Sequence, residues 1–407
     1  MDLSRRSFVA GASATSAVLT MSGSAGNHML GAGFLGEVRA NAYEFPKLDS
    51  ATMKARILFN ENPLGPSVKA LKVLESSSSY LGRYPLSEGP RLEMKLRKLH
   101  GMPYQEMNSE LSLIPRPPLE GDTDLLLGVG SSEILKAIAW AYCSHSGNIV
   151  EAHPSYSAVG DSAVGIPGSQ IQRKIIPLNA SNQVDTPSMI KAIDDQTRVV
   201  VICNPNNPTG TSIPLSQIEA IAQATPLSAL LLVDEAYIEF LPHAEKVSAI
   251  ELAKSRKNII VARTFSKIYG LAGLRIGYGL GATDIIAKLK PYMLGRLSMS
   301  MAGVLAADAS LDDQAHIEKT KALHQKSMVV WQKVAKQMGW KLTKSDVCFC
   351  WMDLGFDAAP LVRFLAERNV LISSGSRWEL PNCVRISMGT EEENEMLLSG
   401  INAFSLA

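Results

Sequence analysis

Two hydroxyls, a lysine and an arginine stand close together in the sequence. Thr264-Phe265-Ser266-Lys267 follows a short apolar run, and Arg275 lies eight residues after Lys267. Hydroxyls and a guanidinium can together bind a phosphate. A lysine in such a cationic, partly desolvated site has a lowered pKa, as a Schiff-base lysine needs. In isolation this segment also fits a surface lysine.

A carboxylate follows another apolar run. Asp234-Glu235-Ala236-Tyr237 comes directly after the four apolar residues 230–233. Burying a carboxylate there is costly unless something pairs with it. A cationic nitrogen of a ligand is such a partner, and a helix-capping aspartate is the alternative.

Two turns with ligand-binding potential follow other apolar runs. Gly128-Val129-Gly130-Ser131-Ser132 opens a helical segment, where glycines allow close backbone approach and free N–H groups can bind a phosphate. Asn204-Pro205-Asn206-Asn207-Pro208-Thr209-Gly210 is a rigid turn whose amides can donate to a ligand oxygen. Each also fits a plain turn. Glu133 occupies the third glycine position of a dinucleotide-binding motif, which disfavours a nicotinamide dehydrogenase.

The elements that position these residues follow from hydrophobic patterning. Short apolar runs without alternation indicate strands buried on both faces, and intervening helix-length segments indicate a mainly parallel α/β sheet over about 85–295. Ligands bind beyond the carboxyl ends of such strands, where the residues above fall. The expected strands are Leu125–Leu127, Val199–Cys203, Leu230–Val233 and Ile259–Ala262, and the expected helices are Ser132–Tyr142, Leu215–Ala224 and Val247–Ala253.

The remainder of the chain, 296–407, predicts a smaller α+β domain. A long helix is expected over about Gln314–Met338, followed by strands at Val347–Met352 and Cys383–Met388 with the helix Pro360–Arg368 between them. Residues 104–123 are rich in proline and polar groups and predict a surface loop.

The N-terminus predicts an export signal over residues 1–42. Arg5-Arg6 precedes a weakly apolar stretch rich in Ala, Gly and Ser, as in the twin-arginine type, and a small-residue cleavage site fits at Ala40-Asn41-Ala42. This predicts a periplasmic or exported protein, or a cytoplasmic one if the signal is not functional. No other run is long enough to span a membrane, so the mature protein is expected not to be membrane-bound.

Composition narrows the choice of partners. Forty basic residues balance 39 acidic ones, so no overall charge favours nucleic acid. The five cysteines form no CxxC pair, which argues against a zinc site or disulfide framework and predicts buried small side chains. No metal site is expected.

Taken together, these motifs resemble the class I/II aminotransferases, and most of all the histidinol-phosphate aminotransferase family. The resemblance runs from about 56 to 395. It rests on the segments above and on these others: Phe59-Asn60-Glu61-Asn62-Pro63-Leu64-Gly65-Pro66, Arg83-Tyr84-Pro85, His153-Pro154-Ser155-Tyr156, Gly270-Leu271-Ala272-Gly273-Leu274-Arg275-Ile276-Gly277-Tyr278 and Val384-Arg385-Ile386-Ser387-Met388-Gly389-Thr390.

The resemblance implies the aspartate-aminotransferase-like fold, also called fold type I, with pyridoxal 5'-phosphate (PLP) as cofactor. It divides the chain into an N-terminal arm that contributes to the small domain (43–84), a large PLP-binding domain (85–295) and a small C-terminal domain (296–407). It also implies a homodimer with shared active sites.

Site roles are implied by the same resemblance. Lys267 would form the Schiff base and shuttle a proton, and Asp234 would pair with the pyridinium nitrogen. Arg385 would bind the substrate carboxylate as a bidentate partner, with Asn62 nearby. Other residues would hold the cofactor: Tyr237 and Asn207 at the ring oxygen, Tyr156 on the ring face, Ser131, Ser132, Thr264, Ser266 and Arg275 at the phosphate, and Tyr84 at the phosphate of the neighbouring subunit.

The resemblance implies ping-pong transfer of an amino group between an L-amino acid, or histidinol phosphate, and a 2-oxo acid. Two alternatives stay open. The first is another PLP reaction on the same fold, such as decarboxylation of an amino-acid phosphate. The second is an inactive binding protein, which the presence of both Lys267 and Asp234 disfavours.

Overall fold

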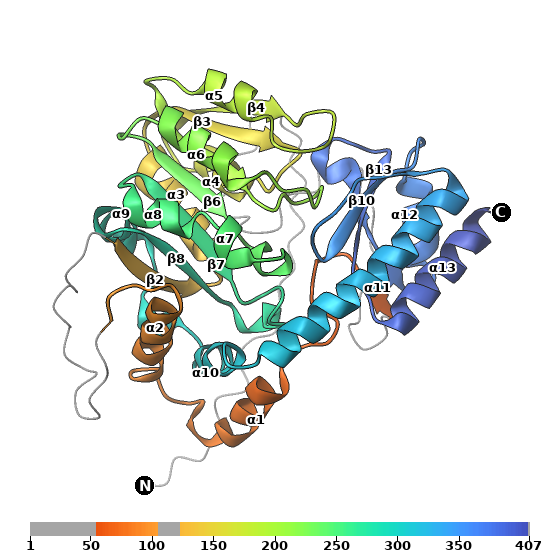
Figure 1. Ribbon diagram of the computed structural model, residues 1–407, viewed down its shortest axis with the longest axis horizontal. Helices are drawn as coiled ribbons and strands as arrows, with labels where there is room; N and C mark the ends of the chain where they lie inside the picture. The colour runs from red at the N-terminus through yellow and green to blue at the C-terminus, as the bar shows by residue number, and fades with distance from the viewer. Residues whose placement is uncertain (1–53, 105–122, 406–407) are drawn as a thin grey trace, which may run out of the picture. The chain divides into compact units, whose positions relative to one another are not determined.

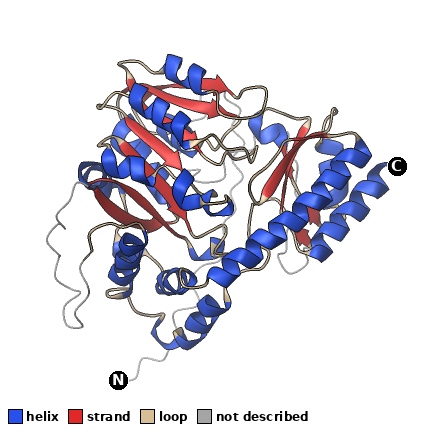
Figure 2. Ribbon diagram, in the orientation of Figure 1, coloured by secondary structure: helices blue, strands red, loops and turns tan. Residues whose placement is uncertain are grey.

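The computed structural model describes residues 54–104 and 123–405. Its strands form two main groups, a seven-stranded large sheet and a four-stranded small sheet, with helices packed against both (Figure 2). The fold is therefore α/β, a mainly parallel sheet accompanied by a smaller antiparallel one, as the sequence predicts.

The large sheet has the strand order β2-β8-β7-β6-β5-β3-β4. Strands β7, β6, β5, β3 and β4 are parallel to one another, whereas β8 is antiparallel to both β2 and β7. The bounds are β2 (Thr123–Val129), β3 (Ser146–His153), β4 (Gln170–Pro177), β5 (Thr197–Cys203), β6 (Leu230–Asp234), β7 (Ile259–Thr264) and β8 (Ile276–Ala282).

Two hydrophobic clusters cover the two faces of the large sheet, because its central strands carry apolar side chains at odd and even positions alike. In β6, Leu231 and Val233 belong to one cluster and Leu230 and Leu232 to the other. The first cluster includes side chains of α2 (Glu88–Leu99), α5 (Thr186–Ala192), α6 (Leu215–Ala224) and α8 (Ile250–Ser255); the second includes α3 (Ser131–Cys143), α4 (Ala158–Val164) and α9 (Thr283–Leu289).

Strand β8 was not among the expected strands, because glycine occupies every second position in its centre. A side chain at these positions has no space: a Cβ atom on Gly277 would lie 2.3 Å from the Ser131 nitrogen, and one on Gly281 would lie 2.8 Å from the Ile259 oxygen. The glycines let the start of α3 and strand β7 approach β8 closely.

The small sheet has the order β12-β13-β10-β9 and is antiparallel throughout. Helices α11, α12 and α13 lie side by side along it (Figure 1). The bounds are β9 (Lys341–Leu342), β10 (Phe349–Asp353), β12 (Ser373–Ser374), β13 (Cys383–Ser387), α11 (Gln314–Met338), α12 (Ala359–Ala366) and α13 (Glu391–Ser405).

The described N-terminal segment contacts both regions. Strand β1 (Ala55–Arg56) pairs in parallel with β11 (Val370–Leu371), while α1 (Val68–Ser76) and α2 pack against α10 (Met301–Ser310). The remaining elements are α7 (Ala244–Val247) and the short turns η1 (Ser78–Tyr80), η2 (Ile238–Phe240), η3 (Ala272–Leu274), η4 (Lys290–Tyr292), η5 (Arg296–Ser298) and η6 (Gly375–Trp378).

The long helix α11 has the expected bounds. Its N-cap Asp313 accepts a hydrogen bond from the His316 N–H, and Gly339, with a φ of 70°, ends it in the left-handed conformation. The expected helix over 247–253 is confirmed only in part, because residues 248 and 249 are not helical. The chain breaks there into α7 and α8, because the buried Glu235 carboxylate accepts hydrogen bonds from the Ser248 hydroxyl and the Ala249 N–H.

Several sequence predictions lie outside the described residues: the export signal (1–42), the start of the arm and nearly all of the loop 104–123. The domain boundaries stay predictions.

All five cysteines are buried and free, as expected. Across 54–104 and 123–405, no helix combines the length and apolar character needed to cross a membrane.

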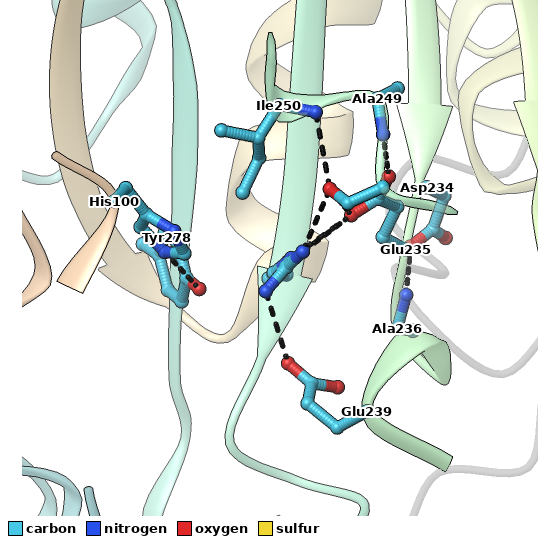
Figure 3. Close-up of polar contacts among 10 residues, drawn as sticks. His100, Asp234, Glu235, Ala236, Glu239, Ala249, Ile250 and Tyr278 are labelled. Atoms are coloured by element: carbon cyan, nitrogen blue, oxygen red, sulfur yellow. Dashed lines mark hydrogen bonds and ion pairs between the residues drawn. The ribbon is translucent and has the colours of Figure 1, made fainter. Parts of the chain in front are cut away.

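A buried ion cluster lies beside the carboxyl ends of β6 and β7. The Arg263 Nε and Nη2 atoms donate to Glu235 Oε2 at 3.0 and 2.9 Å, and Nη1 lies 3.6 Å from Glu239 Oε1. Burial raises the pKa of Glu239 to about 7, although Arg263 opposes that rise. Figure 3 shows Glu235 and Glu239 in this cluster, with Asp234 beside Glu235.

Breaking this buried pair should destabilise the fold strongly. The Arg263→Met substitution leaves Glu235 buried without its cation, so we expect a loss of about 3–5 kcal/mol in the free energy of unfolding, measured by urea denaturation. Arg56→Met is the matched control, because it breaks the exposed pair with Glu61 and should cost less than about 1 kcal/mol. Similar losses in the two variants would contradict the assignment.

Candidate active site

The candidate amine nucleophile lies at the carboxyl end of β7, where the sequence predicts it. The Lys267 Nζ atom donates to the Phe59 carbonyl at 3.0 Å and lies 5.7 Å from the centre of the Tyr237 ring. Burial lowers the pKa of Lys267 to about 8, and the positive charges of Arg385 and Arg275 contribute in the same direction. The amine is therefore a better nucleophile near neutral pH than an ordinary lysine.

The candidate ring partner lies at the end of the neighbouring strand β6. The Asp234 carboxylate is buried and accepts one hydrogen bond, from the Ala236 N–H at 3.2 Å (Figure 3). Burial raises its pKa to about 7. Among the described residues it has no ion-pair partner, so a cationic group beside it would favour its charged form.

A group of hydroxyls, an arginine and a helix N-terminus come together at the ends of β2 and β7. Arg275 Nη1 donates to Ser266 Oγ at 3.4 Å, and Thr264 Oγ1 donates to the same oxygen at 3.0 Å. A Cβ atom on Gly130, whose φ is 72°, would lie 2.5 Å from Arg275 Nη2. The guanidinium therefore lies against the turn that opens α3 at Ser131.

This arrangement has the chemistry of a phosphate site, because hydroxyls, a guanidinium and free N–H groups converge. Ser131 and Ser132 are the first residues of α3, and Ser132 lies close enough to Tyr156 to lower its pKa slightly against the effect of burial. Burial raises the pKa of Tyr156, and the nearby Asp234 charge acts in the same direction. The predicted phosphate ligands and the predicted stacking tyrosine are thus neighbours.

The candidate carboxylate-binding residue, Arg385, is buried on β13 of the small sheet. Its Nη1 donates to Asn207 Oδ1 at 2.5 Å and its Nη2 to the Leu58 carbonyl at 2.5 Å and the Ser373 hydroxyl at 3.4 Å. Its Nε has no partner in the described part of the chain. Burial lowers the pKa of Arg385 to about 10. A buried guanidinium with only neutral partners is suited to bind an anion.

Tyr237 is held in place by an asparagine that the sequence interpretation did not select. The Asn60 Nδ2 donates to the Tyr237 hydroxyl at 2.9 Å, and its backbone N–H donates to the Ser387 hydroxyl at 2.8 Å. Phe349 packs edge-on against the Tyr237 ring at 5.0 Å. Asn60 lies two residues before Asn62 in the same motif, and its φ of 55° is a backbone feature that asparagine tolerates better than most residues.

Asn62 connects the N-terminal arm to the loop after β7 and to helix α11. Its amide donates to the Ile268 carbonyl at 2.9 Å and to the Thr320 hydroxyl at 3.0 Å. Among the described residues, Asn62 makes no hydrogen bond with Lys267 or Arg385, and its predicted role near the substrate stays a prediction. Tyr84 is exposed, so its predicted contact with a neighbouring subunit also stays a prediction.

Three further residues of the site had no signal in the sequence. Cys348 precedes β10 and lies close enough to Lys267 for each to influence the pKa of the other. Ser373 on β12 contacts Arg385, and Trp378 in η6 lies 5.1 Å from its guanidinium carbon. The proximity of Cys348 to Lys267 depends on how the two sheets pack, whereas Ser373 meets Arg385 as its register partner in the β12–β13 pair.

Comparison with known proteins agrees with this geometry. The family model described as aminotransferase class I and II matches residues 58–401. The histidinol-phosphate aminotransferase of Caldicellulosiruptor saccharolyticus is 33% identical over 343 residues, 83% of this chain and 88% of that protein. Histidinol-phosphate aminotransferase 2 of Pseudomonas fluorescens is 32% identical over 356 residues, 87% of this chain and 89% of that protein.

A solved structure supports the same relationship. The histidinol-phosphate aminotransferase of Sinorhizobium meliloti, crystallised with pyridoxal-5'-phosphate, superposes with a TM-score of 0.75 at 26% identity, covering 87% of this chain and 92% of that one. The match of the family model over most of the chain, with relatives above 30% identity, establishes the family. This chain belongs to the class I and II aminotransferases.

Proposed function

We propose that this protein is a PLP-dependent transaminase that moves an amino group between an L-amino acid, or histidinol phosphate, and a 2-oxo acid. One observation carries the proposal. Lys267 and Arg385 donate to the consecutive carbonyls of Phe59 and Leu58. A candidate nucleophile and a candidate carboxylate-binding guanidinium are thus tied to one short backbone segment, as a reaction at the α-carbon of an amino acid requires.

The residues present fit PLP, the cofactor of this family. Asp234 is a buried carboxylate without an ion pair among the described residues, and a pyridinium nitrogen has the charge to complement it. Arg275, Ser266 and Thr264 converge near the N-terminus of α3, which suits a phosphate. Lys267 supplies the amine. When bound, PLP would supply an electron sink for the substrate α-carbon.

The roles of the side chains follow from their contacts. Arg385 would bind the substrate carboxylate with its planar guanidinium and so fix the orientation of the α-carbon. Lys267, with its lowered pKa, would accept and return the proton at that carbon as a general base and acid. Asn60 holds the Tyr237 hydroxyl in position, and both of these side chains are buried.

The proposed substrates are supported by the names of the relatives and by the chemistry of Arg385. Relatives at 32–33% identity are named histidinol-phosphate aminotransferases, which makes histidinol phosphate a candidate. An L-amino acid fits Arg385 equally well. Decarboxylation is the alternative reaction: an L-threonine-O-3-phosphate decarboxylase of Porphyromonas gingivalis has the same fold with a TM-score of 0.70, but at 19% identity it supports only the fold.

Assembly and location are further parts of the proposal. We propose a homodimer with shared sites, supported by the exposed apolar side chains of Tyr80, Leu81 and Tyr84 near the start of α2. We also propose export by the twin-arginine route, supported by the Arg5-Arg6 pair in the N-terminal sequence.

The reaction itself can be tested by product analysis. The full chain with PLP is incubated with 2-oxoglutarate and either histidinol phosphate or single L-amino acids, and glutamate and carbon dioxide are both measured. We expect glutamate to form in step with the oxo product of one donor, without carbon dioxide. Lys267→Ala should lose at least about 1,000-fold in turnover, because the proton shuttle is removed. Carbon dioxide in step with donor loss would instead indicate a decarboxylase.

The lowered pKa of Lys267 predicts how PLP attachment depends on pH. Only the neutral amine attacks the aldehyde of PLP, so the attachment rate should rise about tenfold per pH unit below 8 and level off above about 8. Stopped-flow absorbance of the cofactor-free protein mixed with PLP measures this rate. The control is Nα-acetyl-lysine, whose ordinary amine should keep gaining rate up to about pH 10. A protein profile that also rises to pH 10 would contradict the lowered pKa.

A further inference from the structure

The turn that carries Lys267 contacts the N-terminal arm at two points. The Gly270 N–H donates to the Lys267 carbonyl at 3.0 Å and closes the turn. Asn62 Nδ2 donates to the carbonyl of Ile268, the residue after Lys267, at 2.9 Å. A Cβ atom on Gly270, whose φ is 70°, would lie 2.0 Å from the Gly65 carbonyl oxygen. The backbone next to the candidate nucleophile is therefore fixed by the arm.

The arm side chain that holds this turn is itself held by helix α11. Asn62 Nδ2 also donates to the Thr320 hydroxyl at 3.0 Å. An amide NH2 group has two hydrogens, so the Ile268 carbonyl and the Thr320 hydroxyl together use both. Asn62 Oδ1 accepts from the Leu64 N–H at 3.0 Å, which fixes the direction in which the amide faces. His316 Nε2 lies farther from the same nitrogen, at 3.5 Å, and is the weaker neighbour.

The Thr320 hydroxyl is well prepared to accept this hydrogen bond. Its own hydrogen is used, because Thr320 Oγ1 donates to the His316 carbonyl, one turn earlier in α11, at 2.9 Å. Its lone pairs therefore stay available to Asn62. Because Thr320, Asn62 and Ile268 are all buried, loss of this acceptor would leave an amide hydrogen without a partner away from solvent.

Helix α11 also supports the sheet that carries the second residue of the proposed reaction. It packs against β9 and β10 of the small sheet, and β10 pairs with β13, the strand of Arg385. The same helix reaches the Lys267 turn through Thr320 and Asn62. One rigid element therefore contacts the supports of both the amine and the guanidinium. Proton transfer at the α-carbon requires these two groups at a fixed separation.

We propose that Thr320 is a positioning residue, which acts through Asn62 to hold the Lys267 turn at a fixed place relative to Arg385. The Lys267 amine then meets the α-carbon of a substrate whose carboxylate Arg385 binds. This inference rests on the proposed function, because it assigns Thr320 a part in the same reaction. Among the described residues, Thr320 makes no hydrogen bond with Lys267 or Arg385, so its effect passes through Asn62.

Hydrogen exchange measures this positioning without any reaction. In the full chain, the Gly270 and Leu271 N–H groups donate to the Lys267 and Phe265 carbonyls, so their exchange reports on the turn. Thr320→Val keeps the branched shape of the side chain but removes the acceptor. We expect these two N–H groups to exchange about 10-fold faster or more in that variant, with and without PLP. Thr320→Ser keeps the hydroxyl and should exchange as the unaltered protein does.

Thr225→Val is the matched control. Thr225 is also a buried threonine, and its hydroxyl also donates to the carbonyl four residues earlier, that of Ile221, at 2.8 Å. This variant therefore removes the same kind of hydrogen bond within a helix but leaves Asn62 untouched. Exchange in the Lys267 turn should not change. Equal increases in Thr225→Val and Thr320→Val would reflect a general loss of stability and would overturn the inference.

The reaction gives a second readout, which a purely structural role would not change. The full chain with PLP is mixed with L-glutamate, and cofactor absorbance in a single turnover gives a maximal rate constant and a half-saturating concentration. We expect Thr320→Val to lower the rate constant about 10–100-fold, because the amine is misplaced. The half-saturating concentration should change less than about threefold, because Arg385 still binds the carboxylate. Thr320→Ser should keep most of the rate. The opposite pattern, a change mainly in the half-saturating concentration, would contradict the inference.

Asn62→Ala keeps the test decisive even if Thr320→Val does not fold. It breaks the same contact from the arm side and should give the same faster exchange and the same loss of rate. Adding Thr320→Val to it should cause little further loss, because the two side chains act through one contact. Additive losses, or unchanged exchange in Asn62→Ala, would overturn the inference. Failure of L-glutamate to react would count against the proposed transamination, while hydrogen exchange still decides the role of Thr320.

Discussion

The site depends on one backbone segment that accepts hydrogen bonds from two cations. Residues Leu58 and Phe59 present consecutive carbonyls to Arg385 of the small sheet and to Lys267 beyond the large sheet. The same arm is anchored by β1 pairing with β11 and by Asn62 bonding to Thr320 of α11. Because a guanidinium and an amine are costly to bury without acceptors, these carbonyls hold both groups within reach of one substrate.

The two adjacent carboxylates at the end of β6 have different roles, because their side chains point to opposite faces of the sheet. Glu235 faces Arg263 and receives two hydrogen bonds from it, so its charge is satisfied within the protein. Asp234 receives only a backbone hydrogen bond, and burial raises its pKa to about 7. Successive residues leave a strand on opposite faces, which lets one carboxylate stabilise the fold while its neighbour stays available to a cationic ligand.

Hydrophobic patterning predicted the fold where strands are apolar on both faces, as in β5, β6 and β7, and where a helix has clear ends, as in α11. It failed where tertiary contacts replace local signals. Strand β8 has no hydrophobic pattern, because glycines at alternate positions allow α3 to pack closely against it. The segment 247–253 is divided into two helices, because the Ala249 N–H donates a hydrogen bond to the Glu235 carboxylate. Local propensity is only a weak guide when a distant side chain competes for the backbone.

The sequence by itself determined the fold class, the family and the two residues, Lys267 and Asp234, that follow adjacent strands. The two residues could be placed from the sequence, because a residue just after a parallel strand must lie at the carboxyl edge of the sheet. Only the tertiary structure decided that Asn60 contacts Tyr237, and that Ser373 and Trp378 lie beside Arg385. Those partners are far apart in the chain or on different elements, so no spacing in the sequence encodes their meeting.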